Sequence, residues 1–301
     1  MKVMAVDTSN KAMAMALAED DKLLAVKKIN IKRNHSIQVM PSIANLLEEI
    51  GWQAQDLDRI AVAKGPGSYT GLRIAGTLAK TLAWTLGIDL VAYSSLEALA
   101  LNLALIRQVY ICPLFDARRE NIYTGLYRFD PAGQLENVIE DQHLASQDWA
   151  RRLSDLDEPV YFVGEDVLTF APLFKEKLGP HFIYQRGVSQ LPNVEAMALQ
   201  AQSQPLQDVH HFIPEYLKLA EAEENWLKDN PDADGSTYVE KLDWPAPVLV
   251  DQYSGSGVSK RFKSPPHTGK LHEPGEELPG KSGPKSWRQV PGQFARNCLQ
   301  L

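Results

Sequence analysis

The sequence predicts an α/β fold: a mixed sheet with helices on both faces, followed by a second, looser lobe. Short apolar runs of strand length alternate with segments of helical periodicity through the first hundred residues, and a weaker version of this pattern follows. With 301 residues, 44% of them apolar, the chain can bury one large core or two smaller ones.

Three strands are predicted first, over 3–6, 12–18 and 23–31, with a polar turn at 19–22 that indicates a hairpin. A helix is predicted over 37–50, because large apolar residues recur there at helical spacing and Gly51 supplies the stop. Pro41 indicates either a kink or the true first turn of this helix.

Strands over 59–63 and 90–93 then alternate with helices over 72–86 and from Ser94 to about residue 105. Ser94 and Glu97 have capping-box spacing, which marks the start of the last helix. Three hairpin-like strands followed by alternating helix and strand is the order of a ribonuclease H-like lobe. We therefore assign residues 1–108 to such a lobe.

Residues 109–241 are predicted to form a second, degenerate lobe. Strands are expected over 109–115 and 121–129, with a hairpin turn at 116–120 between them. Further strands are expected over 160–163 and 182–184, and helices over 167–178 and 194–202.

The last sixty residues differ in composition. Residues 242–301 contain eight Pro and seven Gly with almost no apolar periodicity, so a disordered tail is expected. Because the change at Leu242 is abrupt, a frameshift or an error in the gene model is an equally good interpretation.

Charge and cysteine content exclude several classes of protein. The net charge of the chain is −7. Residues 242–301 contain eight basic and five acidic residues and contribute +3, so the first 241 residues have a net charge of −10. Such a body repels phosphate backbones and is not expected to bind nucleic acid alone. Two distant cysteines, no signal-peptide pattern and no apolar run of membrane-spanning length predict a cytoplasmic protein without a membrane segment.

Five motifs together resemble one protein family. They are Asp7-Thr8-Ser9, the string Gly65-Pro66-Gly67-Ser68-Tyr69-Thr70-Gly71-Leu72-Arg73, residues 93–99, Asp116-Ala117-Arg118-Arg119, and residues 214–217. The glycine-rich string is highly specific, whereas the Asp-Thr-Ser turn alone is weak. With them, residues 1 to about 240 resemble the TsaB family, formerly called YeaZ.

The resemblance implies an actin/hexokinase-like fold of two ribonuclease H-like lobes. It also implies a non-catalytic subunit of the machinery that places threonylcarbamoyl on tRNA adenosine, with no cofactor or metal of its own. The implied partners are the catalytic paralogue TsaD and the ATPase TsaE, with tRNA bound only within the complex. A homodimer through the surface that binds TsaD is expected when TsaD is absent.

Two motifs have ligand-binding counterparts in other proteins. Kinases of this superfamily hold phosphate at the turn that Asp7-Thr8-Ser9 occupies, but this turn lacks the glycine that lets a backbone approach phosphate. The loop 65–71 precedes a helix, yet its spacing matches neither the P-loop nor the dinucleotide fingerprint. We expect both to serve turns and packing.

The helix start at Ser94 predicts that no metal is bound there. The paralogue TsaD carries two metal-binding histidines at this point, and alignment on Glu97 places Ser95 and Leu99 at their positions. Neither residue replaces an imidazole ligand. Arg118 and Arg119 are expected on a hairpin tip, where they either contact a partner or tRNA or are simply solvated.

The partner surface is predicted on the first two helices. In the helix from 71 to 86, small residues (71, 75, 79, 83) form a stripe open to a close helix approach, and Trp84 lies on the opposite, polar side. An indole there is either an interface anchor or is covered by the first helix. The predicted partner-binding residues are Ile37, Met40, Leu47, Arg73, Thr77, Lys80 and Trp84.

Two other functions are weighed against this hypothesis. A metal- or nucleotide-dependent enzyme of the same superfamily, a peptidase or a kinase, requires a ligand set that Ser95 and Leu99 do not supply. A ribonuclease H-like nuclease requires several acidic residues converging on two metals, and only Asp7 ends a strand in the first three strands and first helix.

Overall fold

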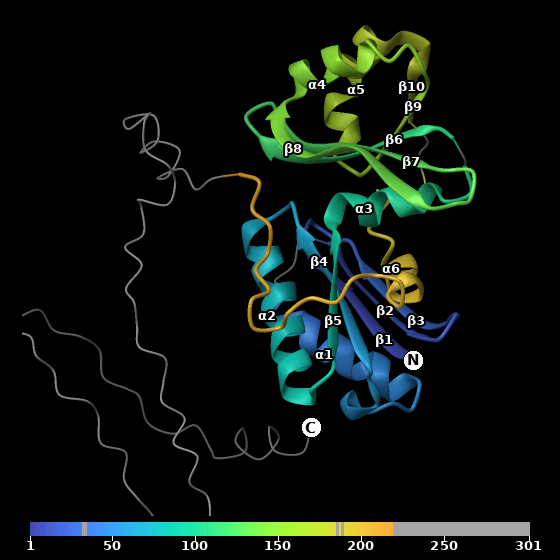
Figure 1. Cartoon of the computed structure of the whole chain (residues 1–301). Helices are drawn as coiled ribbons and strands as arrows, with labels where there is room; N and C mark the ends of the chain where they lie inside the picture. Colours follow the sequence, from blue (N-terminus) through green and yellow to red (C-terminus); the bar gives the residue numbers. More distant parts are fainter. Residues whose placement is uncertain (32–34, 107, 185–186, 188–189, 219–301) are drawn as a thin grey trace, which may run out of the picture. The chain divides into compact units, whose positions relative to one another are not determined.

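The computed structural model describes residues 1–31, 35–106, 108–184, 187 and 190–218. They all belong to one compact unit, Met1–Lys228, while the second unit of the chain, Asp229–Leu301, lies outside the described residues. The predicted tail over 242–301 therefore lies outside them as well. The described part contains two five-stranded sheets with helices packed on them (Figure 1).

The first sheet has the strand order β3-β2-β1-β4-β5. Its strands are β1 (Lys2–Asp7), β2 (Met13–Glu19), β3 (Lys22–Ile29), β4 (Arg59–Gly65) and β5 (Asp89–Ser94). The first three pair antiparallel, and β4 and β5 join them in parallel. The ribonuclease H-like topology predicted for the first lobe is confirmed.

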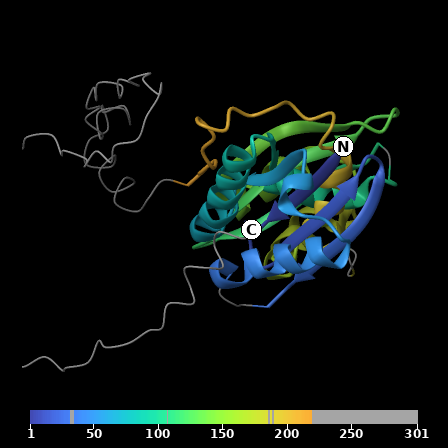
Figure 2. The same ribbon diagram turned by 90° about the horizontal axis from the view of Figure 1, so that it is seen from below.

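Helices cover both faces of this sheet. The helices α1 (His35–Glu49) and α2 (Tyr69–Leu86) pack on one face, next to each other (Figure 2), and α6 (Val194–Gln200) packs on the other. The helix α3 (Ser95–Ala100) follows β5 directly, and short 3-10 turns occupy Ala54–Asp56 and Leu101–Leu103. Because α1 begins at His35, Pro41 lies in its interior, so the alternative that Pro41 marks the first turn is wrong.

The second sheet repeats the order of the first, as β10-β9-β6-β7-β8. Its strands are β6 (Tyr110–Arg118), β7 (Asn121–Phe129), β8 (Leu135–Ala145), β9 (Val160–Val163) and β10 (Phe182–Tyr184). The helices α4 (Ser146–Ser154) and α5 (Val167–Leu178) pack against each other, and a 3-10 turn spans Gly179–His181. The sequence analysis did not predict β8 or α4.

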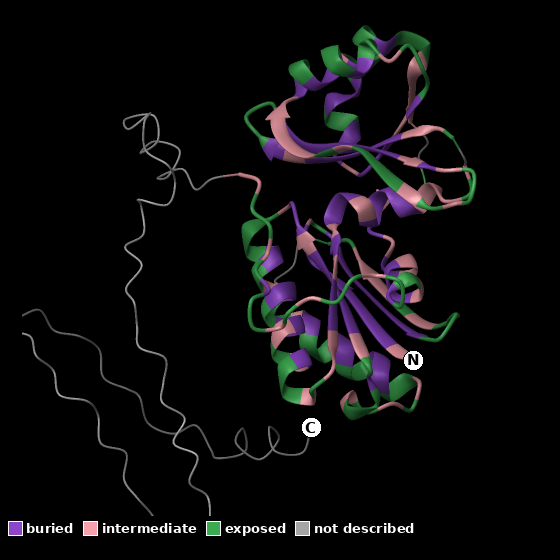
Figure 3. Cartoon of the chain, in the orientation of Figure 1, coloured by how far each residue is buried: buried purple, intermediate pink, exposed green. Residues whose placement is uncertain are grey.

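Three apolar cores hold these layers together. The buried residues lie along the sheets and on the inner sides of the helices (Figure 3). In β1, Met4 and Val6 face the core under α1 and α2, while Val3 and Ala5 face the opposite way. That second core also includes Tyr93 and side chains of β6 and β7, so it is shared by both lobes. Burial on both faces explains why β1 is a continuous apolar run rather than an alternating one.

The helix α6 lies within the range predicted for the second lobe, but it packs on β1, β2 and β3 of the first sheet. Val194, Met197 and Ala198 are fully buried there. The predicted lobe boundaries remain a prediction. The chain returns to the first sheet at α6, which those boundaries assign to the second lobe. Among the described helices, none combines the length and the apolar character required to span a bilayer.

Candidate functional site

A groove of about 620 Å³ separates α1 from α2 on the outer side of the first lobe. It is lined by three residues of α1 and eight of α2, mostly apolar side chains and threonines: Ser36, Val39, Met40, Tyr69, Thr70, Arg73, Ile74, Thr77, Leu78, Thr81 and Leu82. Arg73 is the one charged residue in this lining. The groove is therefore suited to an apolar occupant.

The packing of α2 leaves its outer side available. Gly71, Ala75, Ala79 and Ala83 are all buried, and α2 packs on β1, β4 and β5. The predicted stripe of small residues thus allows close approach of this chain's own sheet rather than of another helix. Ser68 caps the helix by accepting a hydrogen bond from the Gly71 amide, and Gly87 ends it in a left-handed conformation.

Five of the seven predicted partner-binding residues lie where the prediction requires. Met40, Arg73 and Thr77 line the groove, and Ile37 is largely exposed on α1. Trp84 is 69% exposed, so it is not covered by α1, and its ring meets that of His210 edge-on at 6.3 Å. Ile37, Met40 and Trp84 are large apolar side chains that solvent reaches in the isolated chain.

The structure places the other two elsewhere. Leu47 is 7% exposed and packs in the core under α1, because its position on the helix falls on the sheet side together with Ile43 and Leu46. The Lys80 ammonium donates to the backbone carbonyls of His210 and Phe212, at 2.8 and 3.2 Å. The prediction was wrong for Leu47, which is buried. Lys80 holds this chain's own C-terminal segment, and its role in partner binding stays a prediction.

That segment, residues 204–218, is a strap along β5 and α2. The Gln207 amide donates to the Leu90 carbonyl, and the Glu215 amide donates to the Lys64 carbonyl. Phe212 enters the core under α2, and Tyr216 meets Tyr69 with ring centroids 5.0 Å apart. The sequence indicated only residues 214–217 of this strap, because a segment without regular structure has no periodicity to detect.

The glycine-rich loop between β4 and α2 packs closely against two other segments of the chain. A Cβ atom on Gly71 would lie 1.9 Å from the Thr8 carbonyl oxygen, and the Thr8 hydroxyl donates to the Gly71 carbonyl at 2.6 Å. A Cβ atom on Gly65 would lie 2.3 Å from the Glu215 carbonyl oxygen. Pro66 follows Gly65 through a cis peptide bond. The loop thus packs between the turn after β1 and the strap.

The turn Asp7-Thr8-Ser9 is buried beneath this loop. One Asp7 carboxylate oxygen accepts from the Ser9 amide at 2.7 Å, and within the described residues the other oxygen has no hydrogen-bond partner. Burial raises the pKa of Asp7 to about 6, although the Ser9 hydrogen bonds and the Lys28 charge oppose this. A carboxylate without solvent access cannot present itself to a ligand, which fits the expected role in the turn.

A cleft of about 400 Å³ collects residues from two of the motifs. Gly67, Ser68, Asp116 and Arg118 line it, together with Lys11 and Asp166. The Asp166 carboxylate accepts from the Lys11 ammonium at 2.7 Å and from the Asp116 amide at 3.0 Å. Its acidic groups are thus engaged within the chain. Arg118 and Arg119 lie at the β6–β7 hairpin tip, as predicted.

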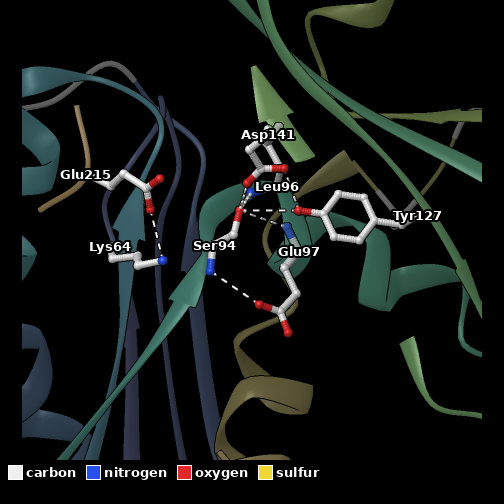
Figure 4. A network of polar contacts seen from close by, with 7 residues as sticks. All are labelled: Lys64, Ser94, Leu96, Glu97, Tyr127, Asp141 and Glu215. Carbon is white, nitrogen blue, oxygen red and sulfur yellow. Dashed lines mark hydrogen bonds and ion pairs between the residues drawn. The ribbon is translucent and has the colours of Figure 1, made fainter. Parts of the chain in front are cut away.

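A polar cavity of about 530 Å³ borders the start of α3 (Figure 4). The Ser94 hydroxyl caps α3, accepting from the Leu96 and Glu97 amides, and it also hydrogen-bonds the Asp141 carboxylate of β8. The Tyr127 hydroxyl donates to the same carboxylate at 2.6 Å, and Lys64 pairs with Glu215 at 2.9 Å. These contacts tie the first lobe to β7 and β8.

Burial is the main cause of perturbed acidity in this cavity. It raises the pKa of Asp141, against the hydrogen bonds from Ser94 and Tyr127, and it raises the pKa of Glu97, against the Ser94 backbone hydrogen bond. It also raises the pKa of Tyr127 well above its usual value. The Ser94 hydroxyl faces a carboxylate without an intervening histidine, so the network is not that of an activated serine nucleophile.

The positions that hold metal-binding histidines in the paralogue are part of the core. Ser95 and Leu99 are both fully buried. Across the described residues, no three His, Cys, Asp or Glu side chains gather where they would hold a metal ion. Cys112 is also buried, which raises the pKa of its thiol to about 11 and keeps it protonated.

Comparison with known proteins identifies the family. A family model described as TsaD, tRNA N6-adenosine threonylcarbamoyltransferase, matches residues 23–226. The tRNA threonylcarbamoyladenosine biosynthesis protein TsaB of Bacillus subtilis (strain 168) is 42% identical over 228 residues, 76% of this chain and 99% of that protein. Its Escherichia coli K12 namesake is 25% identical over 198 residues, 65% of this chain and 84% of that protein.

Solved structures agree with this assignment at the level of the fold. A Pseudomonas aeruginosa protein described as similar to the peptidase YeaZ superposes with a TM-score of 0.61 at 24% identity, over 72% of this chain and 99% of that one. YeaZ from Pseudomonas aeruginosa gives a TM-score of 0.57 at 23% identity and the same coverage. Since the Bacillus subtilis relative is matched along almost its full length, the chain belongs to the TsaB family of tRNA threonylcarbamoyladenosine biosynthesis proteins.

Proposed function

We propose that this chain is a non-catalytic subunit that docks on a TsaD-type catalytic subunit through the surface formed by α1 and α2. The observation that carries this proposal is the composition of the α1–α2 surface, by which we mean the exposed faces of both helices and the groove between them. Large apolar side chains are exposed on this surface, and the lining of its open groove contains a single charged residue.

The exposed apolar residues support a docking role. Ile37 and Trp84 are each 69% exposed, and Met40 is 46% exposed, on two neighbouring helices. Solvated helix faces normally carry charged residues, whereas exposed apolar groups that lie together mark interaction sites. Trp and Arg are also the residues most often found as binding anchors. A helix pair from the partner would bury Trp84 and Met40 together.

The arrangement of the polar groups supports a non-catalytic role. In the polar cavity, Ser94, Tyr127 and Asp141 bind each other and the α3 backbone rather than pointing at free space. The buried Ser95 and Leu99 do not offer the imidazoles that a metal-dependent peptidase or kinase would require. Transfer of the threonylcarbamoyl group would then belong to the partner.

The other components follow from this arrangement. The acidic body disfavours binding of tRNA by the isolated chain, so tRNA would join only within the complex, together with a TsaE-type ATPase. Without the catalytic subunit, the same apolar surface would support a homodimer, because an isologous contact can bury it on both copies.

Calorimetric titration of the TsaD-type subunit from the same cell tests the proposal. We expect tight binding by the wild-type chain, and a loss of about 2 kcal/mol, or roughly 30-fold, for Trp84→Ala. Leu168→Ala is a matched control, because Leu168 is also an exposed apolar residue but lies on α5 of the second lobe. It should bind like the wild type.

Circular dichroism of each variant separates binding from folding. A folded Trp84→Ala variant with unchanged affinity would place the interface elsewhere. Failure of the wild-type chain to bind the catalytic subunit would remove the proposal altogether.

A further inference from the structure

Arg73 differs from the rest of the α1–α2 surface. It is the one charged residue that lines the groove, and it lies on the outer side of α2 between Tyr69 and Thr77. Apart from it, the lining consists of aliphatic and aromatic side chains, serine and threonines. A guanidinium in such surroundings loses its water when the groove is filled.

An aromatic support holds this guanidinium in place. An Arg73 guanidinium nitrogen donates to the Tyr69 hydroxyl at 2.8 Å, and the guanidinium carbon lies 5.2 Å from the centre of the Tyr69 ring. Tyr69 in turn packs against Tyr216 of the strap. Because cation–π contact and packing restrict the side chain before any partner arrives, little entropy is lost when Arg73 forms further contacts.

Arg73 forms no ion pair with a carboxylate of the described residues. Several other described arginines do pair with a carboxylate: Arg59 pairs with Asp89 at 2.7 Å, and Arg151 pairs with Asp148 at 3.4 Å. One hydrogen bond to a tyrosine leaves most of the five N–H donors of a guanidinium available. Arg73 is thus a fixed cation with unused donors inside an apolar groove.

When a partner fills the groove, the Arg73 charge determines whether binding is favourable. A guanidinium removed from water without a partner is strongly unfavourable, whereas one that meets a carboxylate in a two-pronged hydrogen bond is stabilised. We propose that Arg73 makes the groove selective for a partner helix that presents a carboxylate next to its apolar residues. This inference rests on the proposed docking function and specifies the chemistry of the partner.

The same residue makes a second copy of this chain a weaker occupant of the groove than such a partner, although a homodimer can still form when that partner is absent. The helix α2 contains no acidic residue, and α1 contains only Glu48 and Glu49 at its C-terminal end. Neither glutamate lines the groove. Groove-to-groove association of two copies would therefore bury two guanidiniums without carboxylates from the lining. Such an uncompensated charge is a common way for an interface to reject the wrong partner.

Two measurements on Arg73→Met test the proposal. In sedimentation equilibrium, the variant should self-associate at least roughly tenfold more tightly than the wild type, because the buried charge is removed. In calorimetric titration, its affinity for the TsaD-type subunit should fall roughly 30-fold, because the partner's carboxylate is left unpaired. Arg73→Lys should retain part of the partner affinity, and Arg73→Glu should lose more than the methionine variant.

Arg151→Met is the matched control, because it removes one exposed arginine from α4 of the second lobe. It should change neither measurement, and thermal denaturation should show that all variants are folded. A methionine variant that keeps the wild-type partner affinity, or that does not self-associate more tightly, overturns the proposal. If the wild-type chain does not bind the catalytic subunit, the proposed function fails, and the self-association measurement still decides whether Arg73 opposes the homodimer.

Discussion

The two lobes share one strand order but use their outer helices differently. Each sheet carries a pair of helices on its outer face, α1 and α2 on the first and α4 and α5 on the second. Each pair includes a tryptophan. Trp149 of α4 is fully buried in the core of its own lobe, whereas Trp84 of α2 is mostly exposed.

The residues around each tryptophan explain the difference. On α4, Asp148, Arg151 and Arg152 are exposed while Trp149 points inward, which is the usual arrangement of a helix whose outer face remains in water. On α2, the exposed positions near Trp84 are threonines, with Arg73 as the exception. One topology thus supports a helix pair that buries its tryptophan in one lobe and a pair that exposes its tryptophan in the other.

The largest expected effect concerns stability. Trp149→Ala should lower the free energy of unfolding by about 3–5 kcal/mol, because it leaves a cavity in the core and removes the donor that contacts the Cys112 sulfur at 3.2 Å. Trp84→Ala should lower it by less than about 1 kcal/mol. Urea denaturation measures both. Similar losses in the two variants would contradict the contrast between the helix pairs.

A second contrast lies near the end of the first strand of each sheet. Asp7 of β1 is fully buried, and one of its oxygens has no partner in the described part of the chain, while Asp116 of β6 is partly exposed and accepts from the Arg118 amide. Because the pKa of Asp7 in the folded protein, about 6, exceeds that of an unfolded aspartate, the folded state binds this proton more tightly. Stability from this group therefore rises as pH falls through 6.

Asp7→Asn cannot ionise and should remove this dependence. We expect it to exceed the wild type in unfolding free energy at pH 8 by up to about 3 kcal/mol, with the difference vanishing near pH 4. Urea denaturation at several pH values measures it. Glu97 and Asp141 also have raised pKa values, but they titrate in both proteins and cancel in the difference.

Asp116→Asn is the control, because Asp116 is partly exposed and its carboxylate contacts the Arg118 amide and guanidinium. Parallel pH profiles of the wild type and Asp7→Asn would show that the Asp7 carboxylate is not disfavoured by burial.

The smallest expected effect concerns the strap. Lys80→Met removes the hydrogen bonds to the His210 and Phe212 carbonyls and should lower the unfolding free energy by about 1 kcal/mol. Hydrogen exchange should increase at residues 207–212, while partner affinity changes little. A folded Lys80→Met variant with a large loss of partner affinity would show that Lys80 contributes to the docking surface.

Local patterns were sufficient for much of the fold. Strands β1, β4 and β5 are continuous apolar runs, and the Ser94–Glu97 capping box is present as its spacing predicted. The strand β8 and the helix α4 were not predicted. Most of β8 is only partly buried, and α4 is a short, largely polar helix whose apolar side is made by Trp149, Ala150 and Leu153. A strand that buries none of its residues fully, such as the 11 residues of β8, and a helix as short as the 9 residues of α4 both give a weak periodic signal.

By itself, the sequence indicated the order of the elements along the first lobe, the glycine-rich loop and the family, and it predicted a docking surface on α1 and α2. These depend on residue spacing along one segment, which is readable without the neighbours. The tertiary structure alone decided that Leu47 faces the core, that Lys80 holds the strap and that Tyr216 supports Tyr69 and Arg73. Such roles depend on which distant segment covers a side chain, because burial and hydrogen bonding arise only when the chain has folded.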